Sequence, residues 1–432
     1  MRLDHLQHHH YLSRRDLLKA GGAATALAVT GVAGLADAAG AGDADSAESV
    51  VHAAAHYDDT LDTQQALNGT WAAATRARYG ADDQRGSLNE ITARKTARAI
   101  KLAGGSGTKT VIMGHMLRNG VAAFRGFPQR RFEQRITKLG YTSADPSKWF
   151  STTTAGLPGE DEWRQADRTN GPLGYNQGAT PFGRNRLSGH EERFPEGGTY
   201  QIATQLDGLA HIGVEHVFYN GFDARAFATP EAVTKLGIEH VGPIVTRGVL
   251  LDILSMKLER SPGDTQVVEG RPMLANSYRI TIEDMQAALK LAKIKRIEPG
   301  DVVVLRTGWN QLAELSLDAG KGTADFQALA DRYLATEPGI YLREAKWLGD
   351  HRPAIVAADS WGLEVLGVDF GNGYAFPVHN ELITKRGIRI GEGVISDGLV
   401  DEDVHEFCYC YMPNHAYGAT AGGTAPFALI KA

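Results

Sequence analysis

The segment from Gln201 to His211 holds the residues whose types and spacing are best suited to chemistry. If it forms a strand, Gln201, Gln205 and Asp207 lie on one face, because successive side chains of a strand point to opposite sides. Three polar side chains then converge, and His211 follows with an imidazole whose pKa suits proton transfer near neutral pH. The alternative is an exposed strand face on which these side chains are merely solvated. The pattern by itself is compatible with both.

Short apolar runs rich in β-branched residues, separated by Gly and Pro, predict the strands that would surround this segment. The clearest runs are 110–113, 248–253, 301–305 and 354–357. Helices are predicted between them. One spans 282–292, where Thr281 and Asp284 are placed to cap the first turn, and a second runs from 338 to 347. The sequence therefore predicts an α/β fold in one domain.

Length and composition indicate an ordinary globular protein. The chain has 432 residues, of which 43% are hydrophobic and 22% charged, and its 50 glycines indicate many tight turns in a strand-rich body. A net charge of −6 and the lack of a Lys/Arg cluster argue against nucleic acid as the partner, since phosphates require a basic face. We therefore expect a small-molecule substrate.

The N-terminal residues are expected to be a targeting segment rather than part of the fold. Residues 13–19 read SRRDLLK and precede an apolar Gly/Ala-rich run and small residues suited to cleavage. This resembles a twin-arginine export signal, so residues 1–41 are predicted to be removed on export to the periplasm or the extracellular space. A membrane anchor is the alternative, but the run is shorter than the ~20 strongly apolar residues that a span requires. Residues 42–60 are then expected to be a mobile mature N-terminus and 61–432 the folded domain, with no membrane contact after cleavage.

The chain has two cysteines, Cys408 and Cys410, which share one face if 407–411 is a strand. A disulfide between strand neighbours two residues apart would be strained. We expect two buried free thiols and no zinc-binding cysteine cluster.

The segment at 201–211 resembles the metal-binding signature of the cyclase family, which reads H-x-G-T-H-x-D-x-P-x-H in kynurenine formamidase and isatin hydrolase. It is closer still to the Q-x3-Q-x-D-x3-H variant of the zinc-dependent trans-dienelactone hydrolase, which it matches at all four named positions. Other stretches resemble the family in the same order along the chain. They are 79–89, 219–221, 247–252, 299–301 and 306–309.

The resemblance implies a metal-dependent hydrolase in a single cyclase-family domain of the swivelling β/β/α type, with mixed sheets and flanking helices. His211 falls on the position of the catalytic base. His379 and Glu392 fall on the downstream His and Glu that complete the family's site. Without the family resemblance, they would be interpreted as a loop histidine and a solvated glutamate. The residues at metal-ligand positions of the family are Gln201, Gln205, Asp207, His379 and Glu392.

The resemblance also implies a divalent metal ion, with zinc as the leading candidate. Two amide oxygens in place of two imidazoles make a harder donor set, which shifts the preference toward Mn²⁺ or Mg²⁺. Asp207 and Glu392 supply two negative charges, which balance one divalent ion, so one ion is expected rather than two. Because family members are commonly dimers or tetramers, we expect a homodimer or homotetramer.

The expected reaction is the opening of a small cyclic ester or amide, of the lactone type, by metal-activated water, with His211 moving the proton. The chain lacks a Gly-x-Ser-x-Gly motif, which argues against a serine hydrolase. Two alternatives stay open: an arylformamidase that cleaves a linear amide, and a non-catalytic exported binding protein with a degenerate site. The candidates for an apolar wall against the substrate are Phe218, Tyr219, Trp309 and Trp361.

Overall fold

A computed structural model describes residues 56–105, 107–124, 130–139, 189–194, 198–320 and 323–432. The described residues from Tyr57 to Ala432 belong to one compact unit. Near its start, Asp59 accepts hydrogen bonds of 2.8 Å from the guanidinium of Arg279. The predicted export signal lies outside the described residues, as does most of the segment predicted to be a mobile mature N-terminus. Within the described ranges, no helix combines the length and the apolar character needed to cross a membrane.

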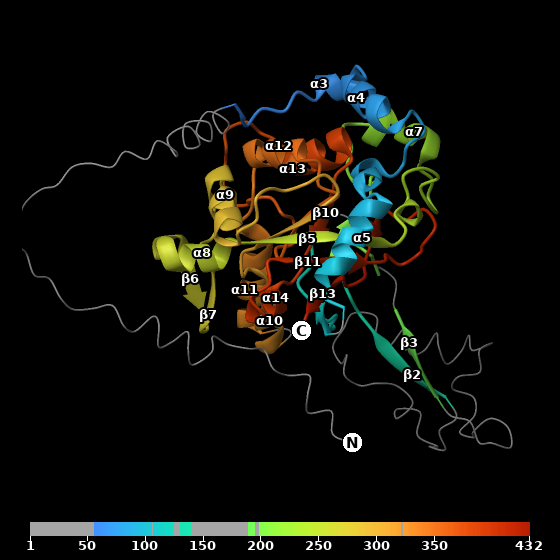
Figure 1. Cartoon of the computed structure of the whole chain (residues 1–432). Helices are drawn as coiled ribbons and strands as arrows, with labels where there is room; N and C mark the ends of the chain where they lie inside the picture. Colours follow the sequence, from blue (N-terminus) through green and yellow to red (C-terminus); the bar gives the residue numbers. More distant parts are fainter. Residues whose placement is uncertain (1–55, 106, 125–129, 140–188, 195–197, 321–322) are drawn as a thin grey trace, which may run out of the picture. The chain divides into compact units, whose positions relative to one another are not determined.

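A nine-stranded mixed sheet forms the centre of the fold (Figure 1). Its strands, in chain order, are β1 Thr108–Ile112, β4 Gln205–Asp207, β5 Ile244–Asp252, β8 Val302–Arg306, β9 Ile355–Ala358, β10 Arg389–Glu392, β11 Glu406–Tyr411, β12 Ala421–Gly422 and β13 Phe427–Lys431. Two smaller sheets pair β2 Arg135–Leu139 with β3 Gly189–Arg193, and β6 Thr265–Val268 with β7 Arg271–Leu274.

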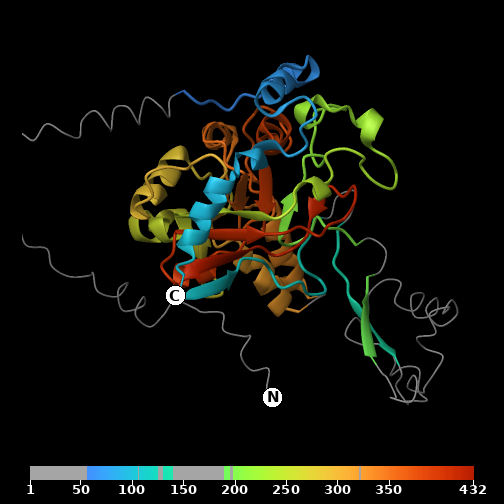
Figure 2. The same cartoon turned by 45° about the vertical axis from the view of Figure 1, so that its right-hand side comes forward.

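The spatial order in the large sheet is β1-β13-β11-β5-β8-β9-β10-β4-β12. The four middle strands β5, β8, β9 and β10 run parallel, and the strands on either side are antiparallel to their neighbours. The last strand, β13, lies beside β1, although the chain between them covers most of the protein (Figure 2). The sheet thus changes from parallel to antiparallel between β10 and β4.

Helices flank this sheet. They are α3 Gln64–Leu67, α4 Thr70–Tyr79, α5 Ala93–Leu102, α7 Ala224–Phe227, α8 Ile253–Arg260, α9 Ile282–Leu291, α10 Asn310–Asp318, α11 Ala324–Ala335, α12 Leu342–Asp350, α13 Pro377–His379 and α14 Asp397–Asp401. A π-helix, η6 Asn380–Lys385, follows α13 directly, and short 3₁₀ turns are η1 Gly86–Glu90, η3 Tyr219–Gly221, η4 Ile238–His240 and η5 Pro262–Asp264.

The core lies on both faces of the middle strands, which explains their continuous apolar runs. In β5, Val249 packs in one cluster with residues of α8, α9 and α12, whereas Leu250 packs in a second cluster with β11 and β13. On the other side of β11, Cys408 and Cys410 pack under α5 with their Sγ atoms 4.0 Å apart. Both are buried free thiols, as predicted.

Apart from the possible strand at 201–211, the predicted elements are confirmed with small shifts in their ends. Helix α9 begins with the predicted capping box, in which Asp284 N donates to Thr281 Oγ1 at 3.1 Å and Thr281 N donates to Asp284 Oδ2 at 3.0 Å. The helix predicted from 338 begins only at Leu342, because Gly339 and Ile340 are used in short β-bridges. The mixed α/β fold expected from the sequence is confirmed.

Candidate metal centre

Two candidate ligands meet where the parallel part of the sheet gives way to an antiparallel strand. Glu392 ends β10, Gln205 begins β4, and the two are direct partners in the strand register. The following residue, Gly393, has φ +59°, and a Cβ there would lie 2.7 Å from the carbonyl oxygen of Ala203, so the turn requires glycine. Asp207 lies two residues further along β4 and therefore faces the same side as Gln205.

Asp207, His379 and Glu392 form a buried cluster in which one ligand atom of each lies within 4.8 Å of the others. Nε2 of His379 is 3.6 Å from Oδ2 of Asp207 and 3.5 Å from Oε1 of Glu392. All three side chains are almost fully shielded from solvent. One imidazole and two carboxylates form a donor set that zinc and manganese both accept in proteins.

His379 is oriented by Glu364, a residue that belongs to no recognisable motif. His379 ends α13 and the π-helix η6 follows at once, and π-turns of this kind are frequent at functional sites. Oε1 of Glu364 accepts from the backbone N–H of His379 at 3.0 Å and lies 2.6 Å from Nδ1. The hydrogen on Nδ1 therefore points to Glu364, and Nε2 is directed at the two carboxylates.

The charge around His379 favours its protonated form. Burial acts to lower its pKa, but the hydrogen bonds to Glu364 and Glu392 and the charge of Asp207 raise the pKa to about 10. A metal ligand must be a neutral imidazole at the coordinating nitrogen. A cation entering the cluster near neutral pH would therefore displace a proton from Nε2.

The strand predicted for 201–211 is present only at Gln205–Asp207. Ala203 has φ +53°, so the chain bends before β4 and Gln201 lies outside the strand. The two glutamines still touch, because Nε2 of Gln205 donates to Oε1 of Gln201 at 2.8 Å. The same amide group faces Oδ1 of Asp207 at 3.4 Å and donates to Oε2 of Glu392. Gln205 thus turns its nitrogen to the carboxylates.

His211 lies at the rim of the cluster, on the turn after β4. Its Nδ1 is 3.1 Å from Nε2 of Gln201, and its Nε2 is 3.9 Å from Oδ2 of Asp207. Burial lowers the pKa of His211, and although Asp207 opposes this shift, the charges of His379 and Arg130 add to it. A neutral imidazole beside an acidic cluster is suited to accept a proton.

The buried oxygens of the cluster fit a divalent cation. Oδ2 of Asp207 is buried and has no hydrogen-bond partner among the described residues, and neither has Oε1 of Gln205, the amide atom that is turned away from the carboxylates. Such orphaned groups cost roughly 1–3 kcal/mol each. Burial raises the pKa of Asp207 to about 6, with His211 opposing the shift and Glu392 adding to it. A divalent ion would supply the positive charge that the two neighbouring carboxylates lack.

Three of the four aromatic residues predicted to line the substrate pack in or against the protein core. Trp309 is fully buried and donates Nε1–H to the carbonyl of Tyr333 at 3.0 Å. Tyr219 is also fully buried and donates its hydroxyl to Asp83 at 2.8 Å, and Phe218 packs against the main core cluster. In the described part of the chain, none of the three has a hydrogen bond or ring contact with the polar residues of the cluster or with His211.

Other aromatic rings approach His379 instead. Phe376 packs edge-on against the imidazole with 5.5 Å between ring centroids, and Trp361 is 6.0 Å from Phe376. Phe124 stacks on Trp361 at 5.9 Å. Phe376 has φ +49°, which is rare for a bulky residue and places its ring at the start of α13. Of the four aromatic candidates, Trp361 is the one that these contacts connect to the cluster, whereas Phe124 and Phe376 carried no signal in the sequence.

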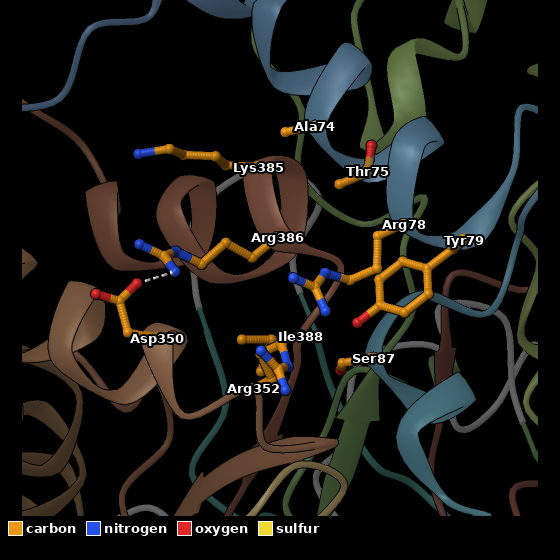
Figure 3. Close-up of a pocket in the computed structure, with 11 residues that line it drawn as sticks. Ala74, Thr75, Arg78, Tyr79, Ser87, Asp350, Arg352, Lys385, Arg386 and Ile388 are labelled. Atoms are coloured by element: carbon orange, nitrogen blue, oxygen red, sulfur yellow. Dashed lines mark hydrogen bonds and ion pairs between the residues drawn. The ribbon is translucent and has the colours of Figure 1, made fainter.

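A cavity of about 270 Å³ lies elsewhere, between α4 and the π-helix η6 (Figure 3). Its lining includes none of the candidate ligands. Its basic side chains already have partners: Arg386 binds Asp350 at 2.7 Å and Glu381 at 2.8 Å, and Nε of Arg352 is 3.2 Å from Glu90. We interpret this region as an ion-pair network that anchors η6 rather than as the site of chemistry.

Comparison with known proteins supports the family suggested by the sequence. Residues 175–365 match the cyclase family model, a range that contains the 201–211 segment and ends before His379 and Glu392. A crystal structure described as a novel cyclase is 27% identical to this chain, with a TM-score of 0.58, covering 82% of this chain and 98% of that one. These two matches confirm the resemblance to the cyclase family.

Two isatin hydrolases are more distant. Isatin hydrolase A from Ralstonia solanacearum is 14% identical, with a TM-score of 0.46, covering 78% of this chain and 96% of that chain. Isatin hydrolase A from Labrenzia aggregata is 12% identical, with a TM-score of 0.44, covering 78% of this chain and 99% of that chain. No curated protein matches the chain significantly.

Proposed function

We propose that this chain is a metal-dependent hydrolase that opens a small cyclic ester or amide of the lactone type. The observation that carries the proposal is the buried cluster of Asp207, His379 and Glu392, with the imidazole of His211 at its rim. Oδ2 of Asp207 lies 3.6 Å from Nε2 of His379 but has no hydrogen-bond partner among the described residues, so it is available as a ligand. The resemblance to the cyclase family supports the same reaction class.

Asp207, His379 and Glu392 are the residues that would hold the ion, and the amide oxygen of Gln205 would be a further donor once that amide turns its oxygen to the carboxylates. When bound, a divalent ion polarises a carbonyl group and increases the acidity of water. Two carboxylates balance the charge of one such ion, so we propose one ion per chain, with Zn²⁺ first and Mn²⁺ or Mg²⁺ as alternatives.

His211 is the proposed general base and acid. It accepts a proton as the water oxygen attacks the carbonyl carbon, and it returns that proton to the ring oxygen or nitrogen when the bond to the carbonyl carbon breaks. The product is the ring-opened hydroxy or amino acid. Since burial lowers the pKa of His211, the imidazole is neutral before the reaction and able to take up the proton.

The glutamine pair links the tautomer of His211 to the cluster. As the amides stand, Gln201 presents its nitrogen to Nδ1 of His211, which leaves the imidazole hydrogen on Nε2. For Nε2 to accept a proton, the amide of Gln201 must turn so that its oxygen accepts from Nδ1–H of His211. The nitrogen of Gln201 then donates to Gln205, whose amide must also turn so that its oxygen faces Gln201 and the carboxylates. That oxygen would lie among the carboxylates, an arrangement that a cation stabilises. The tautomer of His211 that can accept a proton on Nε2 and the orientation of Gln205 that can bind a cation therefore occur together.

The test is a substrate panel of lactones, cyclic imides and aryl formamides, assayed with and without chelator alongside elemental analysis of the purified chain. The proposal expects one divalent ion per chain, ring opening of at least one cyclic substrate, and loss of that activity on chelation. Cleavage confined to aryl formamides would replace the lactone-type reaction with a linear-amide reaction. If no divalent ion binds, the hydrolase proposal fails and a binding protein becomes the better account.

We also propose export by the twin-arginine route and assembly as a homodimer or homotetramer. The leader motif at 13–19 and the cyclase-family resemblance are the grounds for these two proposals. Size-exclusion chromatography with light scattering measures the assembly directly, and a monomer over the working concentration range would contradict it.

A further inference from the structure

The π-helix η6 contacts the turn that carries the proposed general base. It begins at Asn380, the residue after the candidate ligand His379. Nδ2 of Asn380 donates to the carbonyl oxygen of Gly213 at 3.1 Å, and the hydroxyl of Thr384 donates to the carbonyl oxygen of Ile212 at 2.9 Å. These carbonyls belong to the two residues that follow the base in the sequence. One helical segment therefore joins a candidate metal ligand to the turn of the base.

The turn of His211 is held from two directions. On its N-terminal side, the backbone N–H of His211 donates to the carbonyl of Gly208 at 3.1 Å, and that of Gly208 donates to the carbonyl of Thr420 at 2.8 Å. On its C-terminal side, the side chains of Asn380 and Thr384 tie the backbone to η6. Without these side chains the imidazole would be held from its N-terminal side only by these backbone hydrogen bonds.

The helix that supplies these two side chains is itself firmly anchored. Glu381, which is fully buried, binds Lys385 and Arg386 at 2.8 Å each. Arg386 also binds Asp350 at the end of α12, at 2.7 Å (Figure 3). A side chain on a rigid element holds its partner more precisely than one on a loop does. The anchored helix can therefore fix the turn.

The relative position of two histidines depends on this arrangement. The ring centroids of His211 and His379 are 6.3 Å apart, and the planes of the rings meet at 63°. Nε2 of His211 is 3.9 Å from Oδ2 of Asp207. Proton transfer between positioned groups is sensitive to such distances, since a misplacement of about 1 Å can lower a rate roughly 100-fold.

We propose that Thr384 and Asn380 are positioning residues that hold the imidazole of His211 at its working distance from the candidate metal centre. They act through the carbonyls of Ile212 and Gly213 and do not hold the ion. Thr384 is buried, and its hydroxyl oxygen lies 3.3 Å from Nδ2 of Asn380, so the two side chains form one unit. This role rests on the proposed hydrolase function, in which His211 moves the proton.

The kinetic test is Thr384→Val, which keeps the volume of the side chain and removes the hydroxyl that donates to Ile212. We expect kcat to fall by roughly 10- to 100-fold, because the base is displaced, while KM and metal content stay near their wild-type values. Thr384→Ser restores the hydroxyl and should recover most of kcat. Thr246→Val is the matched control, because Thr246 is also buried and its hydroxyl donates to the carbonyl of Gly300 at 2.7 Å, outside the site.

The control separates positioning from general loss of stability. Thr246→Val should lose stability without losing kcat. An equal loss of kcat in the two valine variants, or loss of metal together with activity in Thr384→Val, overturns the proposal. If Thr384→Val does not fold, Asn380→Ala removes the second hydrogen bond at a partly exposed position and should lower kcat in the same way. Wild-type kcat in a folded Asn380→Ala and a folded Thr384→Val also overturns it.

A spectroscopic measurement separates this inference from the hydrolase proposal. Nitrogen-15 spectra of the His211 imidazole are recorded for each variant without substrate. Thr384→Val should shift or broaden these resonances, whereas Thr384→Ser and Thr246→Val should leave them as in wild type. Unchanged resonances in Thr384→Val overturn the positioning role, whatever the turnover. If wild type opens no cyclic substrate but the spectral difference is present, the hydrolase reaction fails and the positioning of His211 by η6 stands.

Discussion

Glu392, the last residue of β10, lies directly opposite Gln205, the first residue of β4, and Gln205 donates an amide hydrogen bond to its carboxylate. This pairing joins the parallel and antiparallel parts of the sheet at the place where the candidate ligands meet. Asp207 enters from the same face of β4, and His379 completes the cluster from α13. The site is therefore built on regular elements, which hold side chains more firmly than loops do.

Asp207→Asn removes one of two negative charges in the cluster while keeping the size of the side chain. We expect the affinity for a divalent ion to fall by more than the 10- to 100-fold typical of changes outside the ligand set. The fold should survive, because the carboxylate is buried with a raised pKa and its charge is a cost in the absence of a cation. Elemental analysis and calorimetric titration measure the effect, with Asp223→Asn, at a half-exposed acid outside the cluster, as control. Unchanged metal content would place Asp207 outside the site.

The family resemblance predicted Gln201 as a metal ligand, but its contacts favour a role in orienting His211. Its amide lies between Gln205 and Nδ1 of His211. Gln201→Ala should therefore keep most of the metal affinity and reduce kcat by roughly 100-fold or more through loss of the oriented base. Nitrogen-15 spectra of His211 would show whether one tautomer is lost. A collapse of metal binding in this variant would restore Gln201 to the ligand set.

The ion pair of Asp252 with Arg306, 3.0 Å apart, should make stability depend on pH. Burial acts to raise the pKa of Asp252, but the charge of Arg306 and hydrogen bonds from Ser255 and Arg306 lower it overall. A lowered pKa contributes stability above the ordinary value of about 3.8, and this contribution is lost as the pH falls through the folded pKa. Asp252→Asn can still cap α8, and Arg306 keeps Asp397 as a partner, so the loss is limited to one charged hydrogen bond. The free energy of unfolding should therefore fall by roughly 1.5–3 kcal/mol at pH 7.

Denaturant unfolding of wild type and Asp252→Asn at pH 7 and pH 3 measures this prediction. The difference in the free energy of unfolding between the two proteins should shrink at the lower pH. A difference that stays constant or grows on acidification would show that the carboxylate is not stabilised by Arg306.

Export through the twin-arginine route requires both arginines of the leader. Arg14→Lys combined with Arg15→Lys should leave the uncleaved precursor in the cytoplasm, because the pair is read as a unit. Cell fractionation and immunoblotting measure the distribution, and substituting Arg2 by Lys is the matched control. Normal secretion of the double variant would exclude this route.

Some contacts of the candidate metal centre follow from the sequence and others do not, for physical reasons. The spacing of Gln205 and Asp207 fixes them on one strand face, so short-range geometry alone brings them together. Glu364 could not be found this way, because its contact with His379 depends on how α13 packs against a loop fifteen residues upstream. At Ala203 the sequence instead predicted structure that is not there. The alternation of polar and apolar residues from 201 onward favoured a strand, but the left-handed conformation of Ala203 interrupts it.

The aromatic residues illustrate the same limit. Trp309 and Tyr219 lie in stretches that resemble the cyclase family, yet each is fully buried and bonded to Tyr333 or Asp83. Their types suit a substrate wall and a core equally well, and only packing decides between the two. Phe376 reaches His379 through a positive φ that its sequence neighbours do not predict.

The most direct test of the account is His211→Asn, measured for both metal content and turnover. His211 is proposed to move a proton and not to hold the ion, so the variant should keep its metal and lose roughly 100- to 10,000-fold in kcat. His216→Asn, at a half-exposed histidine outside the site, should change neither. If His211→Asn loses its metal together with its activity, His211 is a ligand and the base lies elsewhere. If it retains near-normal turnover, the proposed hydrolytic mechanism is wrong.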